Sequence, residues 1–591
     1  MSTLQKSRGP LGLFLLALSA CSEGAPTVEI GGGPAPETSI ESRAGAAQMP
    51  GDVTVVSPTK PVKLMDHVED FSEAVANRFV AFAVELKRRD FQKAAAWIDE
   101  DFVGHGLFGD YANLESEREL GATRKTFDVD AAPVLSKTDW LAQIQGAIGP
   151  WQRVEAVVFK VKGAEFQVGL PQWGQVRFKV SFLGTSAEGG PVAATFWTWA
   201  RVEKRRGEWS LHQLEVTSAV IDERDAPLFT NVSTSTGLAK SGIRFGKPGN
   251  TRFAWQGVAG GDVDGDGRWD LFLPSQTQNF LYMGQPDGSF EDEAEDYGVA
   301  RPAGGTASLF LDFDNDGDQD LFVADEGWVG LGKQTQGNPL RLYVNEGEQF
   351  VERGAQLGFG GHMAAYTLTA LDYDLDGFVD IFVSNYGVQN KENNNDWLDA
   401  TNGAKNVLFR NLGGKGFENV AEAAGLDDGR WSYASAAADF DGDGDTDLSV
   451  VNDYGLNALL QNDGKGGFEN RAEDWDVGDR GNGMGTMWGD FNSDGRLDLY
   501  VANMSSTAGN RILGRMQGKD TEEVKGLFKM AAGNSIFLAQ EDGSFARQDG
   551  NLGGVGASWA WCPLTMDLDL DGHLDIYNCS GYVSGDSAED T

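Results

Sequence analysis

Carboxylates recur at a fixed spacing in a nine-residue stretch that ends at the start of an apolar strand. Acidic residues occupy its first, third, fifth and ninth positions, and Gly267 follows the third of them. Hard oxygen ligands at this density suit Ca²⁺, which takes about six to eight oxygens. Gly267 lets the backbone turn where a Cβ would clash. We therefore predict a calcium loop formed by Asp262, Asp264, Asp266, the main-chain carbonyl of Arg268, and Asp270.

The same stretch returns five times along the chain. A single acidic turn could simply be solvated, but six in the same pattern predict six metal sites, and about six Ca²⁺. Position seven is expected to contribute its carbonyl in every loop. The further predicted ligands are Asp312, Asp314, Asp316, Asp318 and Asp320; Asp372, Asp374, Asp376, Phe378 and Asp380; Asp439, Asp441, Asp443, Asp445 and Asp447; Asp490, Asn492, Asp494, Arg496 and Asp498; and Asp567, Asp569, Asp571, His573 and Asp575.

The EF-hand begins with a similar loop but requires a bidentate Glu at position 12 and a helix on each side. Position 12 of the first loop is Leu273, and apolar strand-like segments follow the loops. The sequence therefore argues against EF-hands. The formal net charge of −41 also argues against a nucleic-acid partner, because phosphate binding needs clustered Lys and Arg.

The chain begins with a targeting segment. Lys6 and Arg8 precede an apolar run that is too short to span a bilayer. The run ends in Leu18-Ser19-Ala20-Cys21, which resembles a bacterial lipobox. This resemblance implies a signal peptide over 1–21 and lipidation of Cys21, with an ordinary secretory signal as the alternative. The implied protein is an exported lipoprotein of the outer membrane or cell surface.

Residues 22–63 are rich in Gly, Pro, Ala, Ser and Thr, which is typical of a flexible tether. A domain is predicted over 64–225. Apolar residues from Val68 to Leu86 recur at helical spacing, and a second short helix is expected after Asp90. After about Trp151 the period changes to two, with strands near 152–162, 176–182, 192–204 and 208–217. This order predicts a small α+β domain.

Two short segments of this domain resemble nuclear transport factor and SnoaL-like proteins, which have a cone-shaped fold. The resemblance is carried by 89–96 and by Asp101-Phe102-Val103-Gly104-His105. Some members of that fold are small enzymes, which makes His105 a catalytic candidate. We interpret it instead as a loop or core histidine. His67 and His212 have no partners at metal-ligand spacing in the sequence, so both are expected at the solvated surface.

From residue 226 to 591 each repeat has the same order of elements. A small-residue strand enters the loop, the loop and its apolar strand follow, and then come elements such as Leu342-Tyr343-Val344-Asn345 and Phe417-Glu418-Asn419-Val420. Four short strands per unit of about 50–65 residues are typical of β-propeller blades. These units resemble the FG-GAP/VCBS repeats of the integrin α head and, over the whole region, the cartilage acidic protein/UnbV-like group. The predicted fold class is therefore mainly β.

We predict six blades, with seven as the alternative. The sixth unit is too short for four strands, and Leu228-Phe229-Thr230-Asn231-Val232 matches the outer-strand element. This segment is expected to complete the last blade and close the ring. Two insertions, about 385–405 and 503–530, are expected to form surface loops, the second with a short helix over 521–530.

Cys562 and Cys579 flank the sixth loop, one on the strand that enters it and one on the strand that leaves it. Strand pairing across the loop would place them within one residue of opposite each other. Export to an oxidising compartment then favours a disulfide. Two reduced core cysteines are the alternative.

The sequence indicates a non-enzymatic, calcium-stabilised propeller on a lipid anchor. Its expected partner is an extracellular or envelope protein or a polysaccharide, bound on a face where Trp397, Trp431, Trp559 and Trp561 are candidates, although blade packing is the stronger interpretation for most of them. The alternatives are a propeller enzyme acting on polysaccharide, activity in the N-terminal domain, and a structural spacer in an envelope complex.

Overall fold

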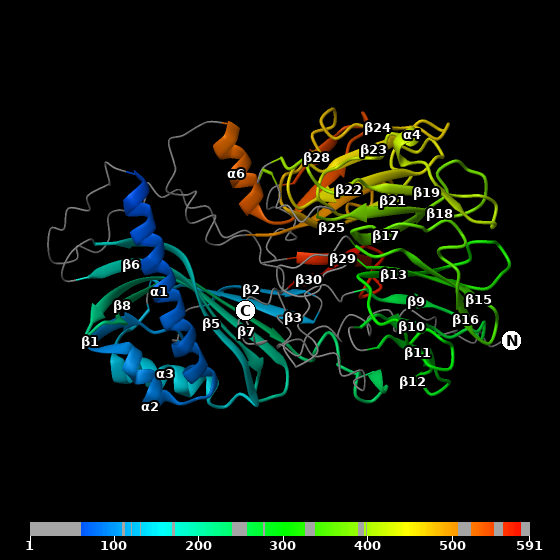
Figure 1. Ribbon diagram of the computed structural model, residues 1–591. Coiled ribbons are helices and arrows are strands. Elements are labelled where there is room, and N and C mark those ends of the chain that lie inside the picture. The colour runs from blue at the N-terminus through cyan, green and yellow to red at the C-terminus, as the bar shows by residue number, and fades with distance from the viewer. Residues whose placement is uncertain are drawn as a thin grey trace.

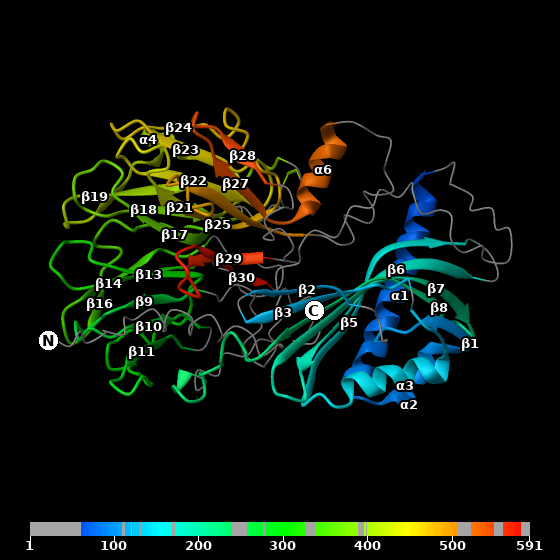
Figure 2. The same ribbon diagram turned by 180° about the vertical axis from the view of Figure 1, so that it is seen from behind.

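The computed structural model describes residues 61–108, 113–119, 121–130, 132–167, 172–238, 257–275, 278–325, 337–387, 395–396, 399–505, 522–548 and 560–580 (Figure 1). The predicted signal peptide, Cys21, almost all of the predicted tether, Trp397 and Trp559 lie outside these residues. The described part divides into an α+β unit on one side and a set of small sheets on the other (Figures 1 and 2).

The α+β unit begins slightly before the predicted boundary. Helix α1 spans Pro61–Lys87 and α2 spans Phe91–Ala94, where the Asp90 side chain accepts a hydrogen bond from the N–H of Lys93. The helix α3 (Lys137–Ile148) and the first strands were not predicted. The strands are β1 (Ile98–His105), β2 (Asn113–Glu119), β3 (Ala122–Phe127), β4 (Val134–Ser136), β5 (Arg153–Phe166), β6 (Trp173–Thr185), β7 (Pro191–Arg205) and β8 (Glu208–Arg224).

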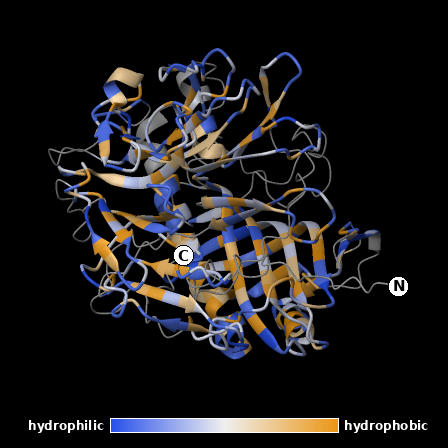
Figure 3. Cartoon of the chain, turned by 90° about the vertical axis from the view of Figure 1, so that its right-hand side faces the viewer, coloured by the Kyte–Doolittle hydropathy of each residue, from blue (hydrophilic) through white to orange (hydrophobic). Residues whose placement is uncertain are grey.

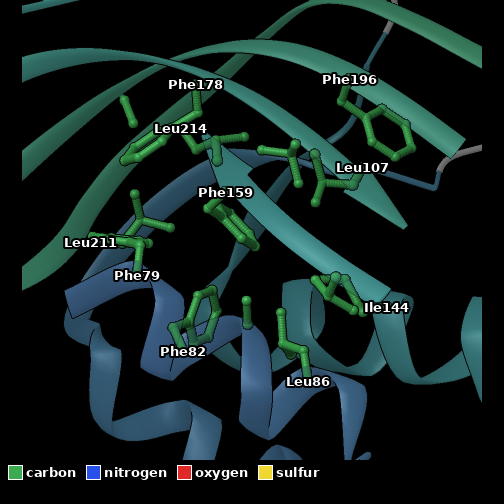
Figure 4. Close-up of a cluster of buried hydrophobic side chains, with 14 of the residues drawn as sticks. Phe79, Phe82, Leu86, Leu107, Ile144, Phe159, Phe178, Phe196, Leu211 and Leu214 are labelled. Carbon is green, nitrogen blue, oxygen red and sulfur yellow. The ribbon is translucent and has the colours of Figure 1, made fainter. Parts of the chain in front are cut away.

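These strands form one sheet in the order β2-β3-β8-β7-β6-β5, with β1 joined in parallel to β8. The four long strands confirm the alternation found in the sequence. Their inward side chains and the apolar face of α1 make one core, in which Phe79, Phe82, Phe159 and Phe178 pack together (Figure 4). A helix laid against a curved sheet in this way agrees with the predicted α+β domain.

The rest of the described chain forms six antiparallel sheets in sequence order. The first five have four strands each, and the sixth has two described strands. They are β9 (Ala259–Gly261) to β12 (Phe290–Asp292), with β10 (Asp270–Leu273) and β11 (Phe280–Gly284); β13 (Ala307–Leu311), β14 (Asp320–Ala324), β15 (Arg341–Asn345) and β16 (Phe350–Glu352); β17 (Ala365–Leu371), β18 (Asp380–Asn385), β19 (Val407–Asn411) and β20 (Phe417–Asn419); β21 (Ser432–Ala438), β22 (Asp447–Asn452), β23 (Ala458–Asn462) and β24 (Phe468–Asn470); β25 (Gly483–Gly489), β26 (Asp498–Asn503), β27 (Ser535–Ala539) and β28 (Phe545–Arg547); and β29 (Ala560–Met566) with β30 (Asp575–Ser580).

The first strands of successive sheets contact one another in turn, from β9 through β13, β17, β21 and β25 to β29. In the first five sheets the second strand is buried along its length, as β18 and β22 are, whereas the described residues of β30 are half-buried. Hydrophobic positions accordingly form bands across the sheets (Figure 3). The repeats are therefore a series of blade-like sheets, each with its own apolar layers against its neighbours.

The segment 228–232 is not a strand, so the predicted way of completing the last sheet is wrong in its detail. Phe229 and Thr236 nevertheless contact the last and the first sheet of the series, respectively. The ring of Phe229 lies 6.1 Å from that of Tyr577 on β30, and the carbonyl of Thr236 accepts the N–H of Phe290 at 2.8 Å. The helix predicted over 521–530 is confirmed as α6 (Glu522–Ala532).

Candidate calcium-binding loops

The six carboxylate loops occupy equivalent places. Each joins the first strand of its sheet to the second, so in every sheet the loop lies at the same end of the strands. Position six needs a glycine in each of them for a visible reason: Gly267 and Gly317, for example, have φ values of 84° and 100°, which L side chains rarely adopt. The repeated sequence thus produces one repeated turn.

Backbone N–H groups shape each loop around the carboxylates at loop positions one and five. In all six loops the glycine at position six donates its N–H to the position-one carboxylate at 2.8–3.0 Å. The N–H of position seven is donated to position five at 2.8–3.1 Å. These bonds fold the carboxylates inwards, so that negative groups face one another.

The carboxylate at loop position nine, which we call the ninth carboxylate, connects the loop to the rest of its sheet. One oxygen accepts the N–H of loop position two, at 2.8–3.3 Å in the six loops. In the first five loops the other oxygen accepts an N–H from the third strand, at 2.7–2.9 Å. The buried acceptors are Asp270, Asp320, Asp380, Asp447 and Asp498. This hydrogen bond to the third strand was not predicted, because it depends on which strand pairs with the one that follows the loop.

The loops retain acceptor oxygens that the protein does not satisfy. Asp262 Oδ1, Asp314 Oδ1, Asp374 Oδ1 and Asp445 Oδ1 are buried and accept no hydrogen bond. Carboxylate oxygens of one loop lie within 4.8 Å of one another in at least four of the loops: Asp262, Asp264 and Asp270; Asp312, Asp314 and Asp316; Asp372, Asp374 and Asp380; and Asp439, Asp441 and Asp447. Clustered, partly unsatisfied carboxylates could hold metal ions, and hard oxygen donors fit Ca²⁺.

Burial opposes ionisation of the ninth carboxylate when no cation is present. Burial, with a smaller contribution from neighbouring aspartates, raises the pKa of Asp270 to about 6 and those of Asp320, Asp380 and Asp447 to about 7. Hydrogen bonds from backbone N–H groups lower these pKa values, but by less than burial raises them. A cation in the loop favours the charged form of a carboxylate.

The six loops differ in the positive charges beside them. Arg496 Nη2 lies 2.5 Å from Asp494 Oδ2, and Arg268 pairs with Asp266 in the same way. In the third loop Arg410 Nη2 lies 2.7 Å from Asp374 Oδ2. No such ion pair is recorded for the second or fourth loop within the described residues, and each of those carries a fifth aspartate, Asp318 or Asp445. Loops two and four therefore have the strongest negative potential.

An aromatic cluster lies at the opposite end of the sheets from the loops. Trp431 is buried, lies 5.2 Å from the ring of Tyr386 and 5.6 Å from that of Tyr454, and donates its indole N–H to Asn402 Oδ1 at 3.1 Å. Trp561 is half-buried, with its ring 5.6 Å from that of Tyr433. For Trp431 the packing interpretation is confirmed. The two predicted insertions leave the sheets at this same end.

The α+β unit contains a cluster of titratable side chains that sequence spacing did not reveal. His212 Nδ1 lies 3.4 Å from Asp99 Oδ2, and His212 Nε2 lies 3.7 Å from Glu203 Oε1. The expectation that His212 is a solvated residue without such partners is wrong, because β1, β7 and β8 bring together residues that are remote in sequence. Arg205 lies in the same cluster, with Nε 3.5 Å from Asp99 Oδ2. The arrangement is therefore an ion-pair network that already contains a cation.

His105 ends β1, where its carbonyl accepts the indole N–H of Trp140 at 3.0 Å. This contact agrees with its interpretation as a structural residue. His67 lies in α1.

The two cysteines near the C-terminus lie on adjacent strands, one position away from direct opposition. Trp561 is opposite Cys579, and Cys562 occupies the adjoining bulge with φ of 36°. This confirms that they are within one residue of opposite each other. Between these two described residues the structure draws no disulfide bond, and the bulge turns Cys562 out of the regular register. The disulfide stays a prediction.

A family model described as "FG-GAP-like repeat" matches residues 262–323, 312–383 and 439–501. Cartilage acidic protein 1 of Mus musculus is 26% identical over 200 residues, which is 33% of this chain and 28% of that protein. The aligned part thus spans little more than a quarter of that relative. No helix within the described ranges has the length and hydropathy needed to cross a membrane.

Solved structures match each part at low similarity. A lectin of Agrocybe aegerita that recognises non-reducing terminal N-acetylglucosamine has 16% identity and a TM-score of 0.30, covering 54% of this chain and 73% of the lectin. The protein Aln2 of a Streptomyces species has 11% identity and a TM-score of 0.19, covering 25% of this chain and 89% of Aln2.

Proposed function

The chain carries FG-GAP-like repeats, and from that premise we propose that it is an exported, calcium-stabilised β-propeller of six blades that binds a ligand outside the cytoplasm. The observation that carries the proposal is the sixfold repetition of one carboxylate turn. An integrin-α-like propeller is a protein of the ligand-binding or adhesion type. A bound Ca²⁺ would neutralise the clustered carboxylates of each loop.

Calcium is supported by the donor set of the loops. At least four loops bring three carboxylates within 4.8 Å of one another, and oxygens such as Asp262 Oδ1 and Asp374 Oδ1 are buried without a hydrogen bond. Burying a carboxylate without a partner costs free energy. A cation supplies the missing partner, and carboxylates with a main-chain carbonyl are the ligands that Ca²⁺ prefers.

The proposed ligand face is the end of the sheets opposite the calcium loops. The long connections β18–β19 and β26–β27 leave from that end, and the cluster around Trp431 and Trp561 lies there. Loops that vary between blades can form a specific surface while the metal loops hold the blades. The partner class remains an extracellular or envelope protein or a polysaccharide, with a lipid anchor at Cys21 as the membrane attachment.

Calcium removal tests this proposal. At about 2 mM Ca²⁺ and dissociation constants of about 10⁻⁴–10⁻³ M, each site contributes about 0.7–1.8 kcal/mol to stability. Chelator should strongly lower the unfolding temperature of the repeat region, as measured by calorimetry. The unfolding temperature of the α+β unit should stay nearly unchanged. Mass measurement of the metal should give about six Ca²⁺ per chain. Asp287→Ala alters an exposed hairpin aspartate outside the loops. As a control variant, it should keep the same metal content and the same response to chelator.

A repeat-region transition that ignores chelation, or a metal content far below six, would show that the loops are not calcium sites. Ligand binding is tested separately, by applying the calcium-loaded protein to glycan and extracellular-protein arrays. Binding that disappears on chelation supports the proposal. Turnover of a polysaccharide on the array would instead favour the enzyme alternative.

A further inference from the structure

Three asparagines connect neighbouring metal loops through the interior of the sheets. Asn345, Asn411 and Asn462 stand at the ends of β15, β19 and β23 and are buried. Each donates its backbone N–H to the ninth carboxylate of the loop in its own sheet, at 2.7–2.9 Å. We call these three residues the asparagine clasps.

The side chain of each clasp reaches the loop of the preceding sheet. Its amide nitrogen donates to the carbonyl of loop position two there: Asn345 to Val263 at 3.1 Å, Asn411 to Phe313 at 2.7 Å, and Asn462 to Tyr373 at 2.8 Å. That carbonyl belongs to the residue between the first two predicted side-chain ligands of the preceding loop. The same amide nitrogen also donates to the carbonyl of position eight in its own loop, at 3.1–3.3 Å. The clasp therefore contacts its own loop through its backbone and side chain, and the preceding loop through its side chain.

Hydrogen bonds continue this link from loop to loop. Tyr373 accepts the Asn462 side chain at its carbonyl and donates its own N–H to Asp380 Oδ2 at 3.1 Å. Asp380 Oδ1 in turn accepts the N–H of Asn411, whose side chain reaches Phe313. An unbroken series of hydrogen bonds thus runs from Asp447 in the fourth loop to Asp270 in the first.

The series ends at both sides of this group of four loops. The fifth sheet has Ala539 at the clasp position, and the first has Gly284. Both keep the backbone half of the contact, with N–H donated to Asp498 at 2.8 Å and to Asp270 at 2.7 Å. Neither has a side chain that can reach the preceding loop. The chain therefore contains clasped and unclasped pairs of loops in the same molecule.

We propose that the asparagine clasps make calcium binding cooperative among the first four loops, and that the fifth loop binds independently of the fourth. The inference rests on the proposed calcium function. A loop closed around its cation holds its ninth carboxylate and its second carbonyl in place, and the clasp transfers that order to the neighbour. Coupling requires contacts that both sites bias, and each clasp is such a contact.

Loops three and four give the clearest test. Within the described residues, Asn462 is the one hydrogen-bonded link between these two loops. Loops one and two are also joined by Gln319, whose Oε1 accepts the N–H of Asp262 at 2.9 Å, and loops two and three by Asn315, whose Nδ2 donates to the Gly377 carbonyl at 3.1 Å. The measurement is amide hydrogen exchange at 372–380 and 490–498 as calcium is titrated.

Asp443→Ala removes an exposed predicted ligand of loop four without touching loop three. It should move the calcium midpoint of protection at 372–380 to about 5-fold higher concentration, within the usual range of coupling. In the Asn462→Ala background the same change should move that midpoint by less than about 2-fold. The midpoint at 490–498 should stay unchanged in both backgrounds. Asn419→Ala alters an exposed asparagine of the third sheet whose side chain accepts the N–H of Ala421 in its own turn, and it should retain the coupling.

A second variant does not depend on weakening the fold. Ala539→Asn restores the missing side chain, so Asp443→Ala should then also shift the midpoint at 490–498. Equal shifts at 372–380 with and without Asn462, or no shift in either background, overturn the inference while leaving calcium binding intact. Absence of calcium-dependent protection at every loop overturns the proposed function, and this inference with it.

Discussion

Removing the carboxylate at loop position nine should cost more stability than removing a metal ligand whose contacts with the protein are exposed to solvent. Asp380 is fully buried and accepts the N–H groups of Asn411 at 2.7 Å and Tyr373 at 3.1 Å. Asp380→Ala leaves two buried donors unpaired, at about 1–3 kcal/mol each. The expected loss is therefore about 2–6 kcal/mol, and it persists in chelator because these bonds do not involve metal.

Asp376 in the same loop provides the contrast. It is exposed, and its carboxylate accepts the N–H of Phe378 at 3.0 Å. Asp376→Ala should cost about 0.7–1.8 kcal/mol at 2 mM Ca²⁺, the share of one site, and no more than about 0.5 kcal/mol in chelator. Urea unfolding of both variants, with calcium and with chelator, gives the four values. The reasoning is refuted if Asp380→Ala loses no more than Asp376→Ala in chelator, or if the loss from Asp376→Ala does not depend on calcium.

Three further changes test individual residues. Arg496→Gln removes the cation that pairs with Asp494, so calcium should bind the fifth loop about 2- to 5-fold more tightly by titration calorimetry, and unchanged or weaker binding would contradict a competing role for that arginine. Cys21→Ser should release the protein from the membrane fraction, and retention of the variant, with no lipid mass on the wild type, would rule out the lipoprotein. Non-reducing peptide mapping of the exported protein should yield a linked Cys562–Cys579 pair, whereas alkylation of both thiols would exclude the disulfide.

The sequence by itself determined the repeated units and the chemistry of their loops. A loop of nine residues is local, so the spacing of Asp312, Asp314 and Asp316 is sufficient to define which carboxylates converge, and Gly317 is sufficient to define where the backbone turns. Period-two alternation likewise defined β6 to β8, because the side-chain period of a strand does not depend on distant residues. The asparagine at the end of the third strand also belongs to a local motif, so the sequence showed that it recurs. The sequence did not show what its side chain contacts.

Only the tertiary structure decided which remote groups meet. The Asn345 side chain contacts Val263, 82 positions earlier, because the sheets pack in sequence order, and no local pattern encodes that distance. His212 meets Asp99 for a similar reason, since the parallel pairing of β1 with β8 could not be derived from either strand alone. The segment 228–232 shows the opposite failure. Its sequence fits a strand, but it packs Phe229 on Tyr577 without joining the sheet, because strand formation requires a partner edge as well as a suitable pattern.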